Sequence, residues 1–174
     1  MLLILSGLPA TGKTTIAREL ARRLRAVHIR IDSIEQAIRD SGGVRAAIDD
    51  AGYRAGYAIA EDNLKLGLIV IADSVNPLPI TRAAWREAGA RAGKRAVEVE
   101  IVCSDPGEHR RRVESRVADI PGHALPTWAE VVARDYQPWD RDLIRIDTAR
   151  TGVGEAVAIL SSYLQRTGAT PESF

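Results

Sequence analysis

Residues 7–14 read Gly7-Leu8-Pro9-Ala10-Thr11-Gly12-Lys13-Thr14 and fit the pattern G-x-x-x-x-G-K-[ST] at every position. The apolar run Leu2–Ser6 precedes this stretch, and a helical pattern over Lys13–Arg25 follows it. A glycine-rich turn between a strand and a helix can curl successive backbone N–H groups into one concavity that suits phosphate oxygens. This context predicts a phosphate-binding loop at a strand–helix junction.

We expect the whole loop and the residue after it to contact a nucleotide: Gly7, Leu8, Pro9, Ala10, Thr11, Gly12, Lys13, Thr14 and Thr15. In this pattern the lysine reaches the β and γ phosphates of ATP, and the Thr14 hydroxyl can bind Mg²⁺. Lys13 is one of only three lysines among 24 basic residues, and arginine cannot replace a compact ammonium charge. A simple glycine turn would explain the two glycines but not the Lys13-Thr14 pair.

Short apolar runs alternate with helical patterns on both sides of the loop. We expect strands at Leu2–Ser6, Val27–Ile31, Leu68–Ala72, Val97–Cys103 and Leu143–Ile146. Helix patterns lie at Lys13–Arg25, Ser33–Arg39, Ala46–Leu66, Pro79–Ala92, Pro106–Val117, Thr127–Arg134 and Val153–Gln165. The first and third strands are apolar almost throughout, as in a parallel sheet that is covered on both faces. The alternation predicts an α/β fold with right-handed crossovers.

Composition narrows the classes of protein and partner. The 174 residues are the length of one ordinary domain, and a hydrophobic content of 45% is typical of globular chains. The net charge of +1 disfavours a general attraction to nucleic acid. The single Cys103 excludes an internal disulfide or a cysteine metal cluster. No apolar run reaches the ~20 residues of a membrane span, so we expect no membrane association and a cytoplasmic monomer or homodimer.

Two aspartates mark the edge of the sheet that the loop shares. The segments Val27–Asp32 and Leu68–Asp73 each end in an aspartate, and the carboxyl ends of parallel strands meet at one edge. We therefore expect Asp32 and Asp73 beside the γ-phosphate. The sequence lacks the N/T-K-x-D motif of GTPases and an LSGGQ-like signature of ABC ATPases, and it is shorter than an AAA+ motor module normally requires. Of the classes of protein that carry such a loop, a compact kinase-like protein remains.

Two long connections are candidates for binding segments. The stretch 33–67 exceeds one crossover, and we expect it to be an acceptor-site insert. The stretch 106–139 contains five arginines and several prolines, and we expect a lid region. In a helix over Pro106–Val117, Arg112 and Arg116 are four residues apart and share a face. Paired guanidinium groups can hold the charge of a transferring phosphate, although such residues also form plain solvated surfaces.

Aromatic residues in these two segments have two interpretations. Tyr53 and Tyr57 lie four residues apart and could form a substrate platform, but aromatic residues at helical spacing more often belong to a core. Trp128, Tyr136 and Trp139 surround Pro138 and could either line the acceptor pocket or pack the lid.

The sequence also resembles a known group. The stretches Gly7–Thr15, Ile31–Ser33 and Ala72–Asn76 and the arginine-rich segment after Cys103 resemble the small P-loop kinases of the AAA_33 and zeta-toxin-like group, which are related to chloramphenicol phosphotransferase and the kinase domain of polynucleotide kinase. The resemblance implies a three-layer P-loop NTPase fold of the nucleoside-monophosphate-kinase type, with a five-stranded parallel sheet of order 2-3-1-4-5 and a helical lid. Several kinases of the group carry an arginine three residues after the base, where this chain has Glu35.

The resemblance also implies site roles. Asp32 would deprotonate the acceptor hydroxyl, and Lys13 and a lid arginine (Arg112 or Arg116) would stabilise the transferring phosphate. Thr148 and Arg150, after the fifth strand, would lie near the adenine. Asp73, after the longer apolar strand, suits a magnesium contact together with Thr14. A purely structural alternative for Asp32 is a cap on a helix that begins at Ser33.

We therefore predict an ATP-dependent and Mg²⁺-dependent phosphotransferase that acts on a hydroxyl of a small molecule. A kinase for nucleic-acid 5′-hydroxyl groups is an alternative that the near-zero net charge disfavours. An ATP-binding regulatory or toxin-type module is another.

Overall fold

The computed structural model describes residues 1–42 and 50–166. Five strands and seven helices follow one another in these ranges: β1 Leu2–Ser6, α1 Lys13–Leu24, β2 Val27–Arg30, α2 Ile31–Asp40, α3 Ala51–Lys65, β3 Val70–Asp73, α4 Pro79–Arg91, β4 Ala96–Val102, α5 Pro106–Ser115, α6 Trp128–Val132, β5 Ile144–Asp147 and α7 Val153–Arg166. Within the described ranges, no helix combines the length and the apolar character that crossing a membrane requires.

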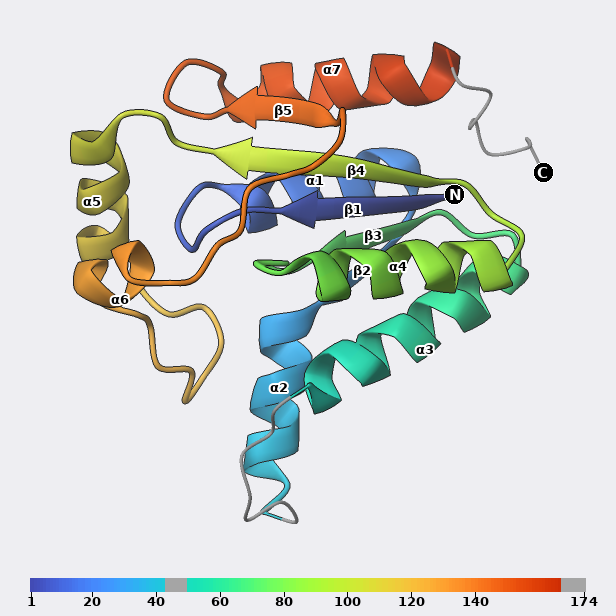
Figure 1. Ribbon diagram of the computed structural model, residues 1–174, viewed down its shortest axis with the longest axis horizontal. Helices are drawn as coiled ribbons and strands as arrows, with labels where there is room; N and C mark the ends of the chain where they lie inside the picture. Colours follow the sequence, from blue (N-terminus) through green and yellow to red (C-terminus); the bar gives the residue numbers. More distant parts are fainter. Residues whose placement is uncertain (43–49, 167–174) are drawn as a thin grey trace.

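The strands form one parallel sheet of order β2-β3-β1-β4-β5, which confirms the predicted fold class and strand order. Helices α1 and α7 cover one face of the sheet and α3 and α4 cover the other, so the molecule has three layers (Figure 1). Helices α5 and α6 lie beyond the carboxyl ends of the strands (Figure 1). This arrangement leaves the phosphate-binding loop, which follows β1, at the edge that faces α5 and α6.

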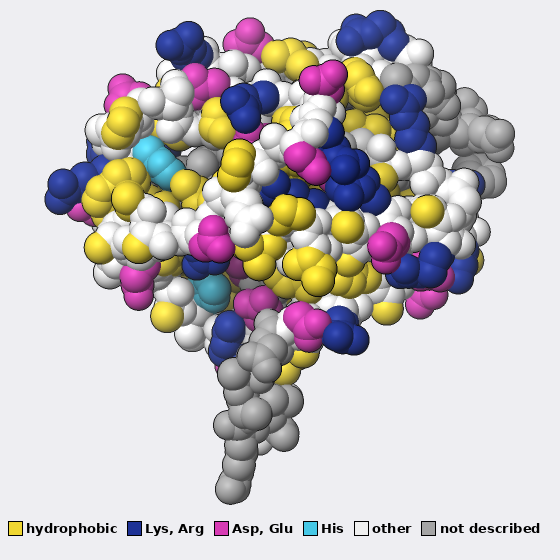
Figure 2. All heavy atoms as spheres, in the orientation of Figure 1, with side chains coloured by type: hydrophobic (Ala, Val, Ile, Leu, Met, Phe, Trp, Pro, Cys, Tyr) yellow, Lys and Arg dark blue, Asp and Glu magenta, His cyan; other side chains and the backbone are white. Residues whose placement is uncertain are grey.

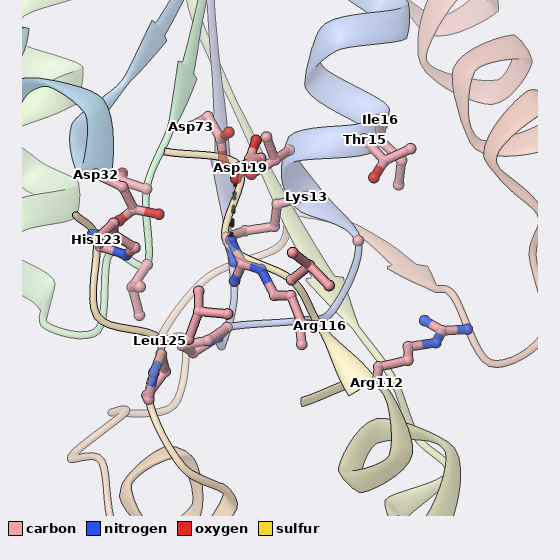
Figure 3. Close-up of a pocket in the computed structure, with 18 of the residues that line it drawn as sticks. Lys13, Thr15, Ile16, Asp32, Asp73, Arg112, Arg116, Asp119, His123 and Leu125 are labelled. Atoms are coloured by element: carbon pink, nitrogen blue, oxygen red, sulfur yellow. Dashed lines mark ion pairs between the residues drawn. The ribbon is translucent and has the colours of Figure 1, made fainter. Parts of the chain in front are cut away.

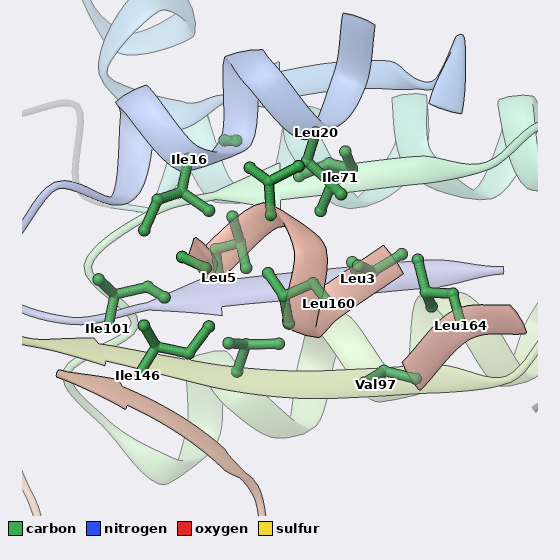
Figure 4. Close-up of a cluster of buried hydrophobic side chains, with 14 of the residues drawn as sticks. Leu3, Leu5, Ile16, Leu20, Ile71, Val97, Ile101, Ile146, Leu160 and Leu164 are labelled. Carbon is green, nitrogen blue, oxygen red and sulfur yellow. The ribbon is translucent and has the colours of Figure 1, made fainter. Parts of the chain in front are cut away.

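Strand β1 is buried on both faces and so belongs to two cores. Leu3 and Leu5 pack with α1 and α7 in the larger core, which Figure 4 shows. Leu2 and Ile4 point to the opposite face and pack with α3 and with Trp85 of α4. Alternation of side chains along a strand makes this division unavoidable, and both sets must be apolar when helices cover both faces. The loop is therefore attached to the most enclosed strand of the sheet.

Many predicted element boundaries differ from the observed ones by a few residues. Strand β2 ends at Arg30 and helix α2 begins at Ile31, so Asp32 lies in the first helical turn and not at a strand end. The apolar run could not locate this boundary, because Ile31 is buried against α3 as a helical residue. Strand β3 spans Val70–Asp73, two residues later at its start than predicted, and Leu68 before it is 40% exposed. The predicted start of the helix at Ala46 lies outside the described residues, and α3 begins at Ala51.

Candidate active site

A cleft of about 1200 Å³ opens at the carboxyl edge of the sheet (Figure 3). The loop after β1 and the first turns of α1 form one wall, and the first turns of α2 form another. The end of α5, the segment that leads to α6 and the loop after β5 complete it. The end of β3 also lines the cleft, so several separate elements converge on one space and contribute polar or charged side chains.

The phosphate-binding loop needs glycine at two positions for different reasons. Gly7 has φ +141°, and a Cβ there would lie 2.1 Å from the Ile101 carbonyl oxygen of the neighbouring strand. Gly12 has φ +96° in the left-handed region and precedes the first residue of α1. Within the loop, the Thr11 hydroxyl donates to the Leu8 carbonyl oxygen at 2.9 Å. The backbone therefore has the tight curl that the sequence pattern predicts, with a helix N-terminus at its end.

Lys13 is buried at the centre of the cleft wall. Its side chain is 7% exposed, and its Nζ donates to the Leu8 carbonyl oxygen at 2.8 Å. Burial lowers the pKa of Lys13 to about 8, although the carboxylates of Asp73 and Asp32 act in the opposite direction. A buried ammonium group near two carboxylates is an electrostatic arrangement suited to anionic phosphate.

Asp73 is the last residue of β3 and is 3% exposed. Its Oδ2 lies 3.2 Å from His28 Nε2, and the Thr14 hydroxyl also hydrogen-bonds to the carboxylate. Burial alone would raise the pKa of Asp73, but the hydrogen bond from His28 and the charge of Lys13 outweigh it and leave the pKa below its usual value. An ionised Asp73 therefore lies beside Thr14. No motif in the sequence singled out His28.

Asp32 faces the cleft from the first turn of α2 (Figure 3). Its side chain is 37% exposed, and its Oδ2 lies 3.6 Å from Nη2 of Arg30. The interpretation of Asp32 as a helix cap is wrong, because Arg30 occupies the N-cap position and no side chain caps this helix. Glu35 follows one turn later, and burial raises the pKa of its carboxyl group while Arg39 opposes that shift. The base candidate is thus free of a capping role and open to the cleft.

The two lid arginines do not share a helical face, contrary to prediction. Helix α5 ends at Ser115, and Arg116 has extended backbone angles of φ −68° and ψ 134°. Arg116 therefore turns toward Lys13, whereas Arg112 points to the far side of the cleft (Figure 3). The Arg112 guanidinium donates to Thr148 Oγ1 at 2.8 Å and to the Thr148 carbonyl oxygen at 3.0 Å. Arg116 thus lies on the side of the cleft that contains Lys13, whereas Arg112 is hydrogen-bonded to the loop after β5.

The sequence matches the family model AAA_33, described as an AAA domain, over residues 2–135. The chain belongs to the AAA_33 family. No curated protein matches its sequence significantly.

Three solved structures resemble this AAA_33 protein over nearly their whole length. The Mycobacterium tuberculosis APS kinase CysC, solved with AMPPNP and APS, is 20% identical with a TM-score of 0.70 over 94% of this chain and 96% of that one. A sugar kinase from Janibacter sp. HTCC2649 is 15% identical with a TM-score of 0.69 over 98% of each chain. A gluconokinase from Sinorhizobium meliloti 1021 is 16% identical with a TM-score of 0.63 over 95% of this chain and 94% of that one. At these identities the likeness establishes that the fold is that of P-loop kinases.

Asp119 is a site residue of this AAA_33 protein that sequence analysis missed. It lies in the segment between α5 and α6, lines the cleft and forms ion pairs with three arginines: Arg18, Arg30 and Arg116. The hydrogen bond from Arg30 is the main cause that lowers the pKa of Asp119 far below its usual range. Only its location in an arginine-rich segment hinted at a role.

Of the two residues predicted near the adenine, Thr148 lines the cleft and Arg150 does not. The Arg150 side chain is 84% exposed, lies 3.6 Å from Asp147 and does not line the cleft. The Thr148 hydroxyl donates to the Thr11 carbonyl oxygen at 2.8 Å and so joins the loop after β5 to the phosphate-binding loop. We leave Arg150 out of the proposed site.

The aromatic residues of the AAA_33 chain pack the scaffold. Tyr57 makes an edge contact with Trp85 at 4.7 Å between ring centroids, and the Tyr53 hydroxyl accepts from the backbone N–H of Asn76. Trp139 lies over the Arg82 guanidinium at 4.0 Å. Trp128 packs edge-on against His109, and Tyr136 also lies on Arg82. None of these five aromatic rings lines the cleft, which favours the packing interpretation.

The oxygen donors at the cleft fit a magnesium ion better than a metal held by protein alone. In residues 1–42 and 50–166, no group of three or more His, Cys, Asp or Glu side chains has a metal-binding arrangement. Mg²⁺ usually takes one or two protein oxygens and completes its coordination with water and phosphate oxygens. The adjoining Thr14 hydroxyl and ionised Asp73 carboxylate match that donor set.

Proposed function

We propose that this AAA_33 protein transfers the γ-phosphate of Mg·ATP to a hydroxyl group of a small molecule. The observation that supports the proposal most is the cleft, which joins the phosphate-binding loop and Lys13 to the open carboxylate of Asp32. A phosphate donor and a proton acceptor in one enclosed space are what hydroxyl phosphorylation requires. The fold shared with P-loop kinases agrees with this chemistry.

The loop half of the cleft would bind the nucleotide. Backbone N–H groups of the loop and the N-terminus of α1 favour phosphate oxygens, and Thr15 at the same helix start is exposed to the cleft. Thr14 and Asp73 would hold Mg²⁺, which neutralises phosphate charge when bound. Lys13 and Arg116 approach from opposite walls and would stabilise the charge on the moving phosphoryl group.

Asp32 would act as the general base in the transfer. The acceptor hydroxyl gives its proton to the Asp32 carboxylate while its oxygen forms a bond to the γ-phosphorus. The bond between that phosphorus and the bridging oxygen breaks, and the electron pair remains on the β-phosphate. Burial keeps the ionised Asp73 in place, whereas the more open Asp32 can reach an acceptor.

The acceptor would lie between α2 and the segment that follows α5. We propose that the chain is one domain (1–174) in which the described part of the insert 33–67 forms one wall and the lid region 106–139 forms the other. Asp32 and Glu35 line this end of the cleft, and Arg39, which also lines it, pairs with Glu35 at 3.3 Å. Asp32 is therefore the acid that opposes a polyanionic acceptor there. Basic and acidic side chains are also interspersed on the face that Figure 2 shows, without a continuous basic track. A small molecule is therefore favoured over nucleic acid.

The direct test is transfer of label from γ-labelled Mg·ATP to defined acceptor pools: sugars and polyols, amino alcohols, nucleosides, and an oligonucleotide with a free 5′-hydroxyl. We expect a labelled product in a small-molecule pool, and we expect the Lys13→Ala variant to form none. Labelling of the oligonucleotide alone would support the nucleic-acid alternative. Release of labelled phosphate with no labelled acceptor in any pool would overturn the proposal.

A further inference from the structure

Asp119 connects three walls of the cleft through one carboxylate. Its two oxygens accept from the two terminal nitrogens of Arg30 at 2.8 Å and 3.0 Å. Arg18 of α1 donates to the same carboxylate. Arg116, at the end of α5, lies 3.9 Å away, along the dashed line in Figure 3. The lid segment is thereby tied to the nucleotide helix and to the start of α2.

Arg30 is the decisive partner because it is buried. Its side chain is 4% exposed, whereas the Arg18 side chain is 44% exposed. A buried guanidinium needs a counter-ion, and its loss leaves an uncompensated charge. Among the described residues, two carboxylates lie within ion-pair distance of Arg30: Asp119 in direct bidentate contact and Asp32 at 3.6 Å. Arg30 therefore stands between the lid acid and the proposed base.

We propose that Asp119 is a positioning residue that holds the lid segment over the cleft and, by satisfying Arg30, leaves the Asp32 carboxylate available to the acceptor. The inference rests on the proposed function, because it assigns Asp119 a task only if Asp32 is the base. When Asp119 is present, both terminal nitrogens of Arg30 are engaged and Asp32 remains beyond hydrogen-bond distance.

Removal of the Asp119 charge would affect two arginines, Arg30 and Arg116. Asp32 becomes the remaining acid within ion-pair reach of Arg30 in the described structure, and a short movement brings it into direct contact. Arg116 also loses its anchor beside Lys13. A displacement of about 1 Å in a reacting group costs on the order of 100-fold in rate. The ion-pair partners of Asp119 in the described structure are Arg18, Arg30 and Arg116, which lie outside the phosphate-binding loop, so nucleotide affinity is expected to persist.

The test compares the full-length wild type with Asp119→Asn and Asp119→Glu, using the acceptor pool that the wild type labels. For Asp119→Asn we expect a loss in kcat on the order of 100-fold, AMPPNP affinity within about threefold of wild type, and faster hydrogen exchange in residues 117–126. Asp119→Glu keeps the charge and the fold, and we expect it to restore most of kcat. Asp140→Asn is a matched control, because that acid is exposed and pairs only with its neighbour Arg141 in the described structure.

The outcomes separate this inference from the proposed function. If the wild type labels no acceptor, the proposed function fails and the inference fails with it. If the wild type labels an acceptor and Asp119→Asn does so at the same rate, the inference alone is overturned. A folded Asp119→Glu variant as slow as Asp119→Asn, or an equal loss in Asp140→Asn, would also overturn it. If Asp119→Asn does not fold, the kcat and the hydrogen exchange of Asp119→Glu decide. An Asp119→Glu variant with partial activity and wild-type hydrogen exchange supports the inference.

Discussion

At the scale of the residue, Lys13 combines burial with a task that requires charge. The residue is 7% exposed and lies near charged groups of both signs. The guanidinium of arginine is planar and larger, so it cannot occupy the same space as a compact point charge. We expect Lys13→Arg to lose phosphotransfer completely, as measured by label transfer. The exposed Lys65→Arg is the matched control, and near-wild-type kinetics in Lys13→Arg would contradict the role of the loop.

Because Lys13 is buried, the positive charge that serves the proposed function also lowers the stability of the folded chain. The pKa of Lys13 is about 8 in the folded chain and ordinarily 10.5, so the folded state loses this proton first as pH rises. Burial of the charge therefore destabilises the wild type fully below pH ~8, and the penalty fades as pH rises toward 10.5. We expect urea unfolding of Lys13→Met at pH 7 to give a free energy of unfolding up to ~3 kcal/mol above that of wild type. Near pH 10.5 this difference should disappear. A variant less stable than wild type at pH 7 would contradict the expectation.

The two aspartates of the cleft predict different kinetic defects. Asp32→Asn removes the proposed base, so we expect turnover to fall ~10²–10⁴-fold while Mg·AMPPNP binds normally. Asp73→Asn weakens the proposed magnesium contact, so we expect the magnesium concentration for half-maximal rate to rise. Titration of magnesium and nucleotide against each variant measures both effects. Wild-type turnover in Asp32→Asn would place the base elsewhere.

What the sequence could predict at this scale depends on distance along the chain. The loop residues form one continuous motif with a known local geometry, so their pattern was sufficient. Asp119 contacts Arg30 across 89 positions, and His28 contacts Asp73 across 45. No local pattern marks such pairs, because they exist only after the sheet and the lid segment have formed. Both residues were therefore missed as site residues.

At the scale of the element, the ends of helices were the weak point of the sequence analysis. Helix α5 begins at Pro106 as predicted, because Asp105 supplies a side-chain cap and proline suits the first turn. Its end was placed two residues late, since neither glycine nor proline follows Ser115. Because of that error, Arg116 was expected on a helical face, whereas its backbone is extended. The orientation of one lid arginine thus depended on a boundary that the sequence does not mark.

The lid region provides a prediction at this scale. Residues between α5 and α6 lie over the cleft and are held largely by charged contacts, such as Asp119 with Arg30. Phosphate charge can reorganise such contacts and order the segment. We expect Mg·AMPPNP to slow hydrogen exchange across 106–139 by a larger factor than across α7, which serves as the internal reference. Equal exchange with and without nucleotide would indicate that this region is fixed surface.

At the scale of the whole molecule, β1 links stability to the site. It lies at the centre of the strand order, contributes to both cores and leads directly into the loop. The alternation of apolar runs and helices predicted the α/β class, whereas the strand order came from the resemblance to small P-loop kinases. Alternation alone does not specify which strands are neighbours. The two-sided apolar character of β1 was readable because a central parallel strand must be buried on both faces.

This arrangement predicts that core and site contribute separately to unfolding. Leu160 of α7 is 1% exposed and packs on the sheet away from the cleft, so Leu160→Ala should cost ~2–5 kcal/mol of unfolding free energy. Nucleotide binds only the folded state and adds ~2.7 kcal/mol at one hundred times its Kd. We expect Leu160→Ala to melt earlier yet retain that full increment with Mg·AMPPNP, and Lys13→Ala to melt near or above wild type yet lose it. Loss of the increment in a folded Leu160→Ala would mean that packing under α7 sets the loop conformation, and the two contributions would then be coupled.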